Sequence, residues 1–182
     1  MDTTGHPADN GTCRFVNVDF PNVIEVREAL IPSGEREKNV ASDLNDLHWF
    51  DAVDFRKEDG AIFIASGVFI YFKKNDVKKL FCAMAERFPG ARLAFDAQNR
   101  KGMELDLKAI KASGIDIGTN FCLDDPEREL LGWCDHFVSV RKKGMMAGYM
   151  KSVKRFGILY RLLAAYSDKS GMSQLDVIEF KS

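Results

Sequence analysis

A chain of 182 residues is long enough for one domain with a substantial hydrophobic core. Apolar residues make up 46% and charged residues 29%, and the formal net charge is −1, so composition alone favours neither nucleic acid nor an anionic membrane as a partner. The longest apolar stretch, 61–72, is shorter than the ~20 residues that cross a bilayer. We therefore expect a single domain over 1–182.

The cysteines are widely spaced and form no C-x-x-C pair, which predicts reduced thiols. The first twenty residues lack the basic start and apolar run of a signal peptide, so we predict a cytoplasmic protein. No histidine lies near a second ligand at a metal-like spacing, and we expect no metal site. His48, among apolar neighbours, is expected to be partly buried and hydrogen-bonded. The cysteines are Cys13, Cys82, Cys122 and Cys134.

The first part of the chain predicts strand, helix, strand and short helix. Residues 14–18 form an apolar strand pattern, and Pro21 opens a helix that runs to about Leu30. A second strand is expected over 39–41, with a short helix around 49–53.

The next part predicts a buried strand, a helix and a further strand. Residues 61–65 are an unbroken apolar run, as in a central parallel strand buried on both faces. Asn75 is predicted to cap the following helix, and 91–95 is the next strand. The apolar face of that helix is formed by Val77, Leu80, Phe81, Met84 and Phe88.

These strands lie about 20–26 residues apart, which leaves room for helical crossovers. The order therefore predicts a doubly wound α/β sheet whose ligand sits at the carboxyl ends of the strands. The later part predicts a helix, a shorter helix capped by Asp124 or Asp125, a strand, a helix and a strand that closes an antiparallel pair. Their expected ranges are 101–113, 126–133, 137–141, 152–166 and 174–180, with Val153, Phe156, Tyr160 and Leu163 on one face of the last helix.

Five short motifs occur in order over the first ~100 residues, each weak alone. Together they resemble the leucine carboxyl methyltransferase family, including bacterial polyketide O-methyltransferases of tetracenomycin type, while the rest of the chain matches only in general layout. The motifs are Met1-Asp2-Thr3, Asp19-Phe20-Pro21-Asn22-Val23-Ile24, Asp43-Leu44-Asn45-Asp46-Leu47-His48-Trp49, Ala65-Ser66-Gly67-Val68-Phe69-Ile70-Tyr71 and Phe88-Pro89-Gly90-Ala91-Arg92-Leu93-Ala94-Phe95-Asp96.

The resemblance implies a Rossmann-like class I methyltransferase sheet with S-adenosylmethionine as cofactor. Asp2 then belongs to the cofactor site, Asp19 accepts the ribose hydroxyls, and Asp43 and the Leu44 amide bind adenine. The cofactor's amino acid end is expected near Ser66–Val68.

Each of these positions also has a plainer interpretation, which the sequence leaves open. Asp19 could cap the helix that starts at Pro21. Asp43 could be an exposed loop residue or a cap of the segment after it, and Gly67 could serve packing alone.

Three departures from the family pattern stand out. The G-x-G strand and turn that should come first are absent, so the resemblance implies an N-terminally truncated chain without the first strand. Ser66 replaces the family's usual glutamate, and Thr4 stands where many bacterial members have arginine. We expect such a chain to close the gap with residues 1–13, to pair between subunits or to aggregate, and to bind S-adenosylmethionine poorly.

The resemblance implies methyl transfer to a carboxylate or hydroxyl oxygen of a small molecule. No catalytic base can be named, and Tyr71 and Asp96 are the candidates for the substrate side. The alternative is a non-catalytic methyltransferase-fold protein that acts as an oligomer or an interaction module.

One segment, 136–167, contains no Asp or Glu. The positive electrostatic potential of this segment could attract a partner that carries a carboxylate or phosphate. Alternatively, the segment could be a solvated basic helix face. Without an aromatic-interleaved motif it does not indicate nucleic acid, and we predict neither a nucleic acid nor a membrane partner. A homo-oligomer through unpaired sheet edges is the remaining candidate assembly. The basic residues are Arg141, Lys142, Lys143, Lys151, Lys154, Arg155 and Arg161.

Overall fold

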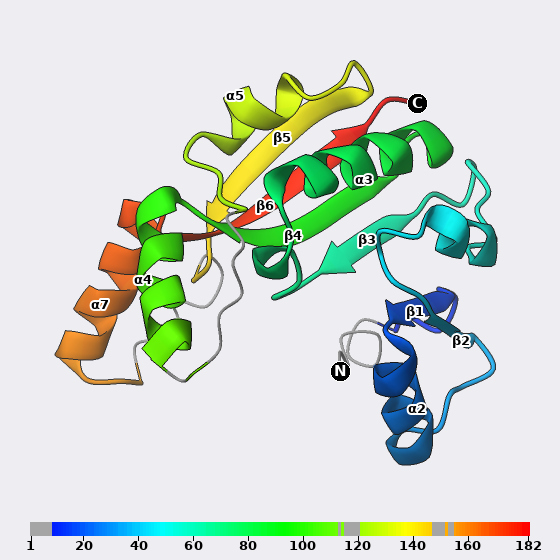
Figure 1. Cartoon of the computed structure of the whole chain (residues 1–182), viewed down its shortest axis with the longest axis horizontal. Helices are drawn as coiled ribbons and strands as arrows, with labels where there is room; N and C mark the ends of the chain where they lie inside the picture. The colour runs from blue at the N-terminus through cyan, green and yellow to red at the C-terminus, as the bar shows by residue number, and fades with distance from the viewer. Residues whose placement is uncertain (1–8, 113, 115–120, 147–151, 153–154) are drawn as a thin grey trace. The chain divides into compact units, whose positions relative to one another are not determined.

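The computed structural model describes residues 9–112, 114, 121–146, 152 and 155–182. These fall into two compact units, Met1–Phe55 and Arg56–Ser182, each with its own sheet (Figure 1). In the described part of the chain, no helix has both the length and the apolarity needed to cross a membrane. A single domain over the whole chain stays a prediction.

The first unit is a parallel strand pair with a crossover helix. Asp19 lies opposite Ala41 in the register. The strand, helix, strand and short helix predicted from the sequence are all confirmed. Their bounds are β1 Phe15–Asp19, α2 Pro21–Leu30, β2 Glu37–Ala41 and the 3-10 helix η1 Leu47–Ala52.

Helix α2 buries one apolar and one charged side chain. Arg27 and Ile24 are its buried residues, and Arg27 Nη2 lies 2.6 Å from Glu37 Oε1 in an ion pair that is almost fully buried. Asn17 donates a second hydrogen bond, of 2.7 Å, to the same oxygen. The hydrogen bond from Arg27 lowers the pKa of Glu37, which therefore stays ionised.

The second unit contains a four-stranded sheet in the order β3-β4-β6-β5. Strands β3 and β4 are parallel, and β6 runs antiparallel to both of its neighbours, which confirms the closing antiparallel pair. The elements are β3 Ile62–Ala65, η2 Phe69–Tyr71, α3 Lys74–Arg87, β4 Arg92–Gln98, α4 Arg100–Ala112, α5 Pro126–Leu131, β5 Phe137–Gly144, α7 Ile158–Ser170 and β6 Ser173–Phe180.

The core of this unit lies between α3 and one face of its sheet (Figure 1). The ring centroids of Phe81 on α3 and Phe95 on β4 are 5.0 Å apart. Those of Phe63 on β3 and Phe88, the residue after α3, are 4.8 Å apart. All five residues of the predicted apolar helix face are buried, which confirms that helical pattern.

Strand β3 is not the centrally buried strand that its apolar run predicts. It lies at one end of its sheet and hydrogen-bonds to β4 alone among the described strands. Ile62 and Ile64 are 67% and 52% exposed, because α3 covers only the other face. An unbroken apolar run lacks the alternation of apolar and polar residues that marks a strand with one solvent-facing side. The run therefore does not show whether one or both faces of the strand are buried.

Two local predictions are wrong. Lys73, not Asn75, is the N-cap residue of α3, and no side chain caps that helix. The His48 side chain is 90% exposed, with Nε2 3.9 Å from Asp46 Oδ1, because Trp49 and Phe50 fill the apolar side of η1.

The last helix also differs from its prediction. It spans Ile158–Ser170, whereas the pattern predicted 152–166, and Val153 lies outside the described residues. Phe156 lies before the helix, and Phe156, Tyr160 and Leu163, predicted to share one helix face, are all exposed.

All four cysteines are free thiols. Cys82 Sγ donates to the carbonyl of Trp133 at 3.8 Å, and burial, with a hydrogen bond to Cys134, raises the pKa of Cys82 to about 12. No group of three His, Cys, Asp or Glu within the described ranges is arranged to hold a metal ion.

We expect Gly102→Ala to destabilise the protein by about 1–3 kcal/mol, as overpacking does. Alanine in place of glycine normally stabilises a helix interior by about 1 kcal/mol. A Cβ at Gly102, however, would overlap the backbone carbonyl of Met172. Urea unfolding measures the change, with Gly34→Ala as the control because nothing lies within 4 Å of a Cβ there. A Gly102→Ala variant as stable as the parent would contradict this packing.

Candidate functional site

The two strands of the first unit bring acidic residues to one edge. Asp19 is the last residue of β1 and lies opposite Ala41, the last residue of β2. The Ser42 amide donates to the Asp19 carbonyl at 2.9 Å, which extends the pairing by one step. Asp43 follows directly. Because parallel strands end at the same edge, both carboxylates lie at the carboxyl edge of this sheet.

Each carboxylate uses one oxygen in local hydrogen bonds and leaves its second oxygen without a described donor. Helix α2 has Phe20 as its N-cap with no side-chain hydrogen bond, so Asp19 does not cap the helix. Asp19 Oδ1 accepts only the neighbouring Phe20 amide, at 2.8 Å. Asp43 is exposed, and its Oδ1 accepts the amide and the side-chain nitrogen of Asn45 at 2.9 and 3.0 Å. Within the described residues, the second oxygen of each carboxylate has no donor.

Leu44 adds a donor beside these acceptors. Its carbonyl accepts from Trp49 Nε1 at 3.4 Å, which ties the loop to the buried indole. Its amide meets no acceptor in the described part of the chain. Two carboxylate oxygens that can accept and one amide that can donate therefore remain for a ligand with hydroxyl or amino donors and an acceptor atom.

In the second unit a tight turn follows β3. Gly67 has a φ of +66°, a conformation that glycine adopts without strain, and its amide donates to Asp96 Oδ1 at 2.6 Å. Ser66 and Gly67 are exposed, and Val68 is half-buried at the start of η2. Asp96 on β4 thus positions the turn at the carboxyl end of β3.

The other predicted site residues are placed as follows. Tyr71 ends η2 with an exposed ring. Asp2 lies outside the described residues.

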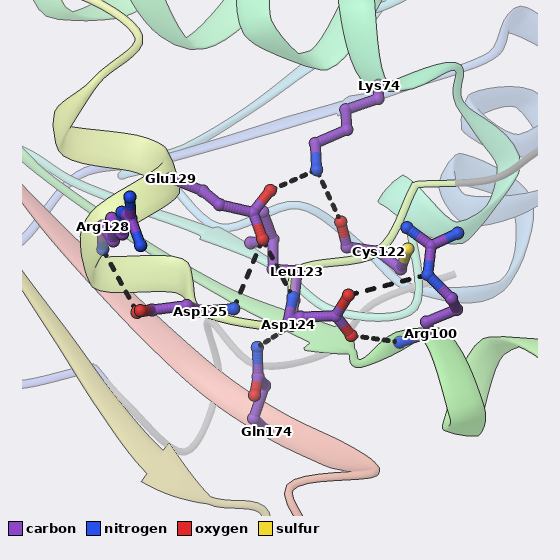
Figure 2. A network of polar contacts seen from close by, with 9 residues as sticks. All are labelled: Lys74, Arg100, Cys122, Leu123, Asp124, Asp125, Arg128, Glu129 and Gln174. Carbon is purple, nitrogen blue, oxygen red and sulfur yellow. Dashed lines mark hydrogen bonds and ion pairs between the residues drawn. The ribbon is translucent and has the colours of Figure 1, made fainter.

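Figure 2 shows a polar network that no sequence pattern predicted. Lys74, at the start of α3, forms an ion pair with Glu129 of α5 and donates to the Cys122 carbonyl at 3.2 Å. Glu129 Oε1 in turn accepts the amides of Asp124 and Asp125, at 3.0 and 3.3 Å.

The network fixes the segment 121–125 beside the end of β4. The Leu123 amide donates to the Gln98 carbonyl at 2.9 Å. Asp124 Oδ1 accepts the Arg100 amide at 2.9 Å, so Asp124 serves the start of α4. Asp125 is the N-cap of α5 and accepts from Arg128, which resolves the predicted choice between the two aspartates. The run Asp124-Asp125-Pro126 predicts the start of α5 from sequence. The ion pair between Lys74 and Glu129 could not be predicted, because the two residues lie 55 positions apart.

A search against models of protein families finds no match. Among characterised proteins, the tetracenomycin polyketide synthesis O-methyltransferase TcmP of Streptomyces glaucescens is 26% identical over 86 residues. That alignment covers 47% of this chain and 31% of the relative. The match thus spans less than half of either protein.

Solved structures show the fold. A DUF574 family protein from Streptomyces avermitilis superposes with a TM-score of 0.62 at 13% identity, covering 93% of this chain and 65% of that one. Human N-acetylserotonin methyltransferase, in complex with S-adenosylmethionine, gives a TM-score of 0.54 at 8% identity and covers 93% and 41%. The chain has the Rossmann-like fold of class I methyltransferases. It spans less than two thirds of the length of these proteins.

Proposed function

We propose that this chain belongs to an S-adenosylmethionine-dependent O-methyltransferase that methylates a carboxylate or hydroxyl of a small molecule. The observation that carries the proposal is the pair Asp19 and Asp43 at one strand edge, each with an oxygen that no described residue uses. The fold and the partial similarity to a polyketide O-methyltransferase support the reaction class.

In this proposal the first unit binds the adenosine part of the cofactor. Asp19 accepts the ribose hydroxyls, because a carboxylate can accept two donors at once. Asp43 accepts the adenine amine, and the Leu44 amide donates to a ring nitrogen. A nicotinamide cofactor fits less well, since the chain contains no G-x-G-x-x-G for a pyrophosphate.

On the family resemblance, we assign the turn Ser66–Val68 to the amino acid end of a bound cofactor. Ser66 offers a neutral hydroxyl where the leucine carboxyl methyltransferase family usually has a glutamate. The cofactor's ammonium group therefore meets no negative charge at this position. Asp96 acts here as a positioning residue, because its Oδ1 already holds the Gly67 amide. Tyr71, exposed just beyond the turn, is the candidate for contact with the methyl acceptor.

The cofactor would supply an electrophilic methyl group, and the protein would align the acceptor oxygen with that methyl group. A carboxylate acceptor is already a nucleophile, so its methylation needs alignment more than a base. The alternative is a methyltransferase-fold protein that binds partners without transferring a methyl group, which the serine at position 66 favours.

Calorimetric titration with S-adenosylhomocysteine and, separately, with NAD tests the cofactor class. We expect heat of binding with S-adenosylhomocysteine at concentrations where NAD gives none. Tighter binding of NAD would overturn the assignment. Binding of S-adenosylhomocysteine without any methyl transfer to a panel of carboxylic and phenolic acceptors would favour the non-catalytic alternative.

A further inference from the structure

Helix α7 turns most of its large apolar side chains toward solvent. Ile158, Leu162 and Tyr166 lie four residues apart and form one row along the helix, with exposed fractions of 74%, 63% and 56%. Leu159 and Leu163 form the neighbouring row, with 70% and 58% exposed. These five side chains are called the α7 stripe.

The opposite side of α7 makes its contacts with the rest of the unit. Ala164 is buried there, and Asp168 Oδ1 accepts the Met146 amide at 2.8 Å. Gly144 on β5 lies so close to the Asp168 carboxylate that a Cβ would overlap it. An amphipathic helix normally buries its apolar stripe against its own domain. On α7 the side that carries Ala164 and Asp168 faces the unit instead. The α7 stripe is therefore exposed and available to a binding partner.

The charges around the stripe select the kind of partner. Arg155 precedes α7, Arg161 lies on it and Lys169 is in its last turn, and all three are exposed. None of them forms an ion pair with another described residue. Over 136–169 the sequence has eight basic residues and one acidic one, Asp168, whose carboxylate accepts the Met146 amide. A second copy of the chain would bring like charges together, whereas an anionic partner would neutralise them.

We propose that α7 docks on an anionic lipid bilayer with the stripe in the interfacial region. Its 13 residues extend about 20 Å, well short of the ~30 Å hydrocarbon core, so the helix lies along the surface. A helix with an apolar face and basic flanks is the sequence type that binds such interfaces. Tyr166, in the stripe, suits the headgroup level, where tyrosine is enriched.

The near-neutral charge of the whole chain gave no reason to expect this contact. The reason to expect a bilayer contact is local: basic residues gather around one helix with an exposed apolar face. The inference goes beyond the proposed methyl transfer and does not depend on it.

Co-sedimentation of the full chain with two kinds of vesicle tests the proposal: phosphatidylcholine alone, and phosphatidylcholine mixed with phosphatidylglycerol. We expect binding to the anionic vesicles at least about tenfold tighter than to the neutral ones, weakening as salt is added. Replacing the stripe leucines together, by Leu159→Ser, Leu162→Ser and Leu163→Ser, should abolish it. Leu105→Ser, at a leucine of α4 that is 50% exposed, is the matched control and should bind like the parent.

A second variant tests the charges without touching the stripe. Arg155→Gln, Arg161→Gln and Lys169→Gln together should remove the preference for anionic vesicles while circular dichroism stays unchanged. Equal binding to both kinds of vesicle, or no binding to either, would overturn the proposal. Self-association that Leu162→Ser removes, without vesicle binding, would show that a second copy covers the stripe.

Discussion

The contribution of one buried aspartate to the stability of the protein should fall as pH rises from about 4 to 7, by at most about 1.4 kcal/mol per pH unit. Asp176 on β6 has no exposed surface, and burial raises its pKa to about 7 from an ordinary 3.8. Gln174 Nε2 donates to Asp176 Oδ2 at 3.2 Å, while Asp176 Oδ1 has no partner among the described residues. Lys142 on the neighbouring strand offsets only part of the burial cost.

The sign follows from which state holds the proton. Between pH 4 and 7 the folded protein keeps Asp176 protonated and the unfolded chain does not, so raising the pH favours unfolding. Above about pH 7 both states are ionised, and the full cost, of the order of 4 kcal/mol, is present. Asp176→Asn stays neutral at every pH and should therefore be more stable than the parent by up to that amount at about pH 8.

Urea unfolding of the parent and of Asp176→Asn across this pH range measures the effect. Glu179→Gln is the control, because the contribution of Glu179 to stability should change with pH in the opposite direction. A hydrogen bond from Ser139, together with Arg141 and Arg92, lowers the pKa of Glu179, so its contribution is lost as the solution is acidified. Parallel pH profiles for the parent and Asp176→Asn would show that Asp176 is not buried as described.

Asp43→Ala should weaken binding of S-adenosylhomocysteine by about 1.5–3 kcal/mol, which is roughly 10- to 150-fold in Kd, because a charged acceptor for the adenine amine is lost. Its effect on the free energy of unfolding should stay under ~0.5 kcal/mol, since the hydrogen bonds that Asp43 makes to Asn45 are exposed. Titration calorimetry and urea unfolding of the same samples separate the two effects.

Two further variants show whether charge or loop order is responsible. Asp43→Asn keeps an oxygen that can hold the Asn45 amide but removes the charge, so it should lose part of the affinity. Asp46→Ala removes another exposed carboxylate of the same loop, which accepts the His48 amide, and should bind like the parent. Unchanged affinity in Asp43→Ala would refute the adenine assignment.

Local sequence patterns predict the first unit well. A proline at the first turn fixes the start of α2, and short stretches on either side indicate β1 and the second half of β2. The edge residues Asp19 and Asp43 could be named because the family resemblance places such residues at the ends of these strands. That Asp19 is free of the helix cap could not be foreseen, since an aspartate two residues before a helical proline fits both roles.

Predictions failed where burial depends on distant parts of the chain. The run 61–65 is apolar throughout, but Ile62 and Ile64 are exposed because α3 covers one face alone. Residues 152–166 carry an apolar periodicity, but the α7 stripe faces outward because Ala164 and Asp168 make the inward contacts. Alternation in β6 predicts a strand, but not that Gln174 and Asp176 occupy its buried face. In each case the pattern gives the element and its period, and only the tertiary neighbours decide which side is covered.

Saturation-transfer difference NMR of S-adenosylhomocysteine with this chain tests the central claim most directly, because it detects weak binding and reports which ligand protons touch the protein. If the β1–β2 edge holds adenosine, the adenine and ribose H1′ protons should receive the strongest saturation, and Asp19→Ala combined with Asp43→Ala should remove it. Saturation of the homocysteine protons alone, or an adenosine signal that survives in the double variant, would contradict the claim.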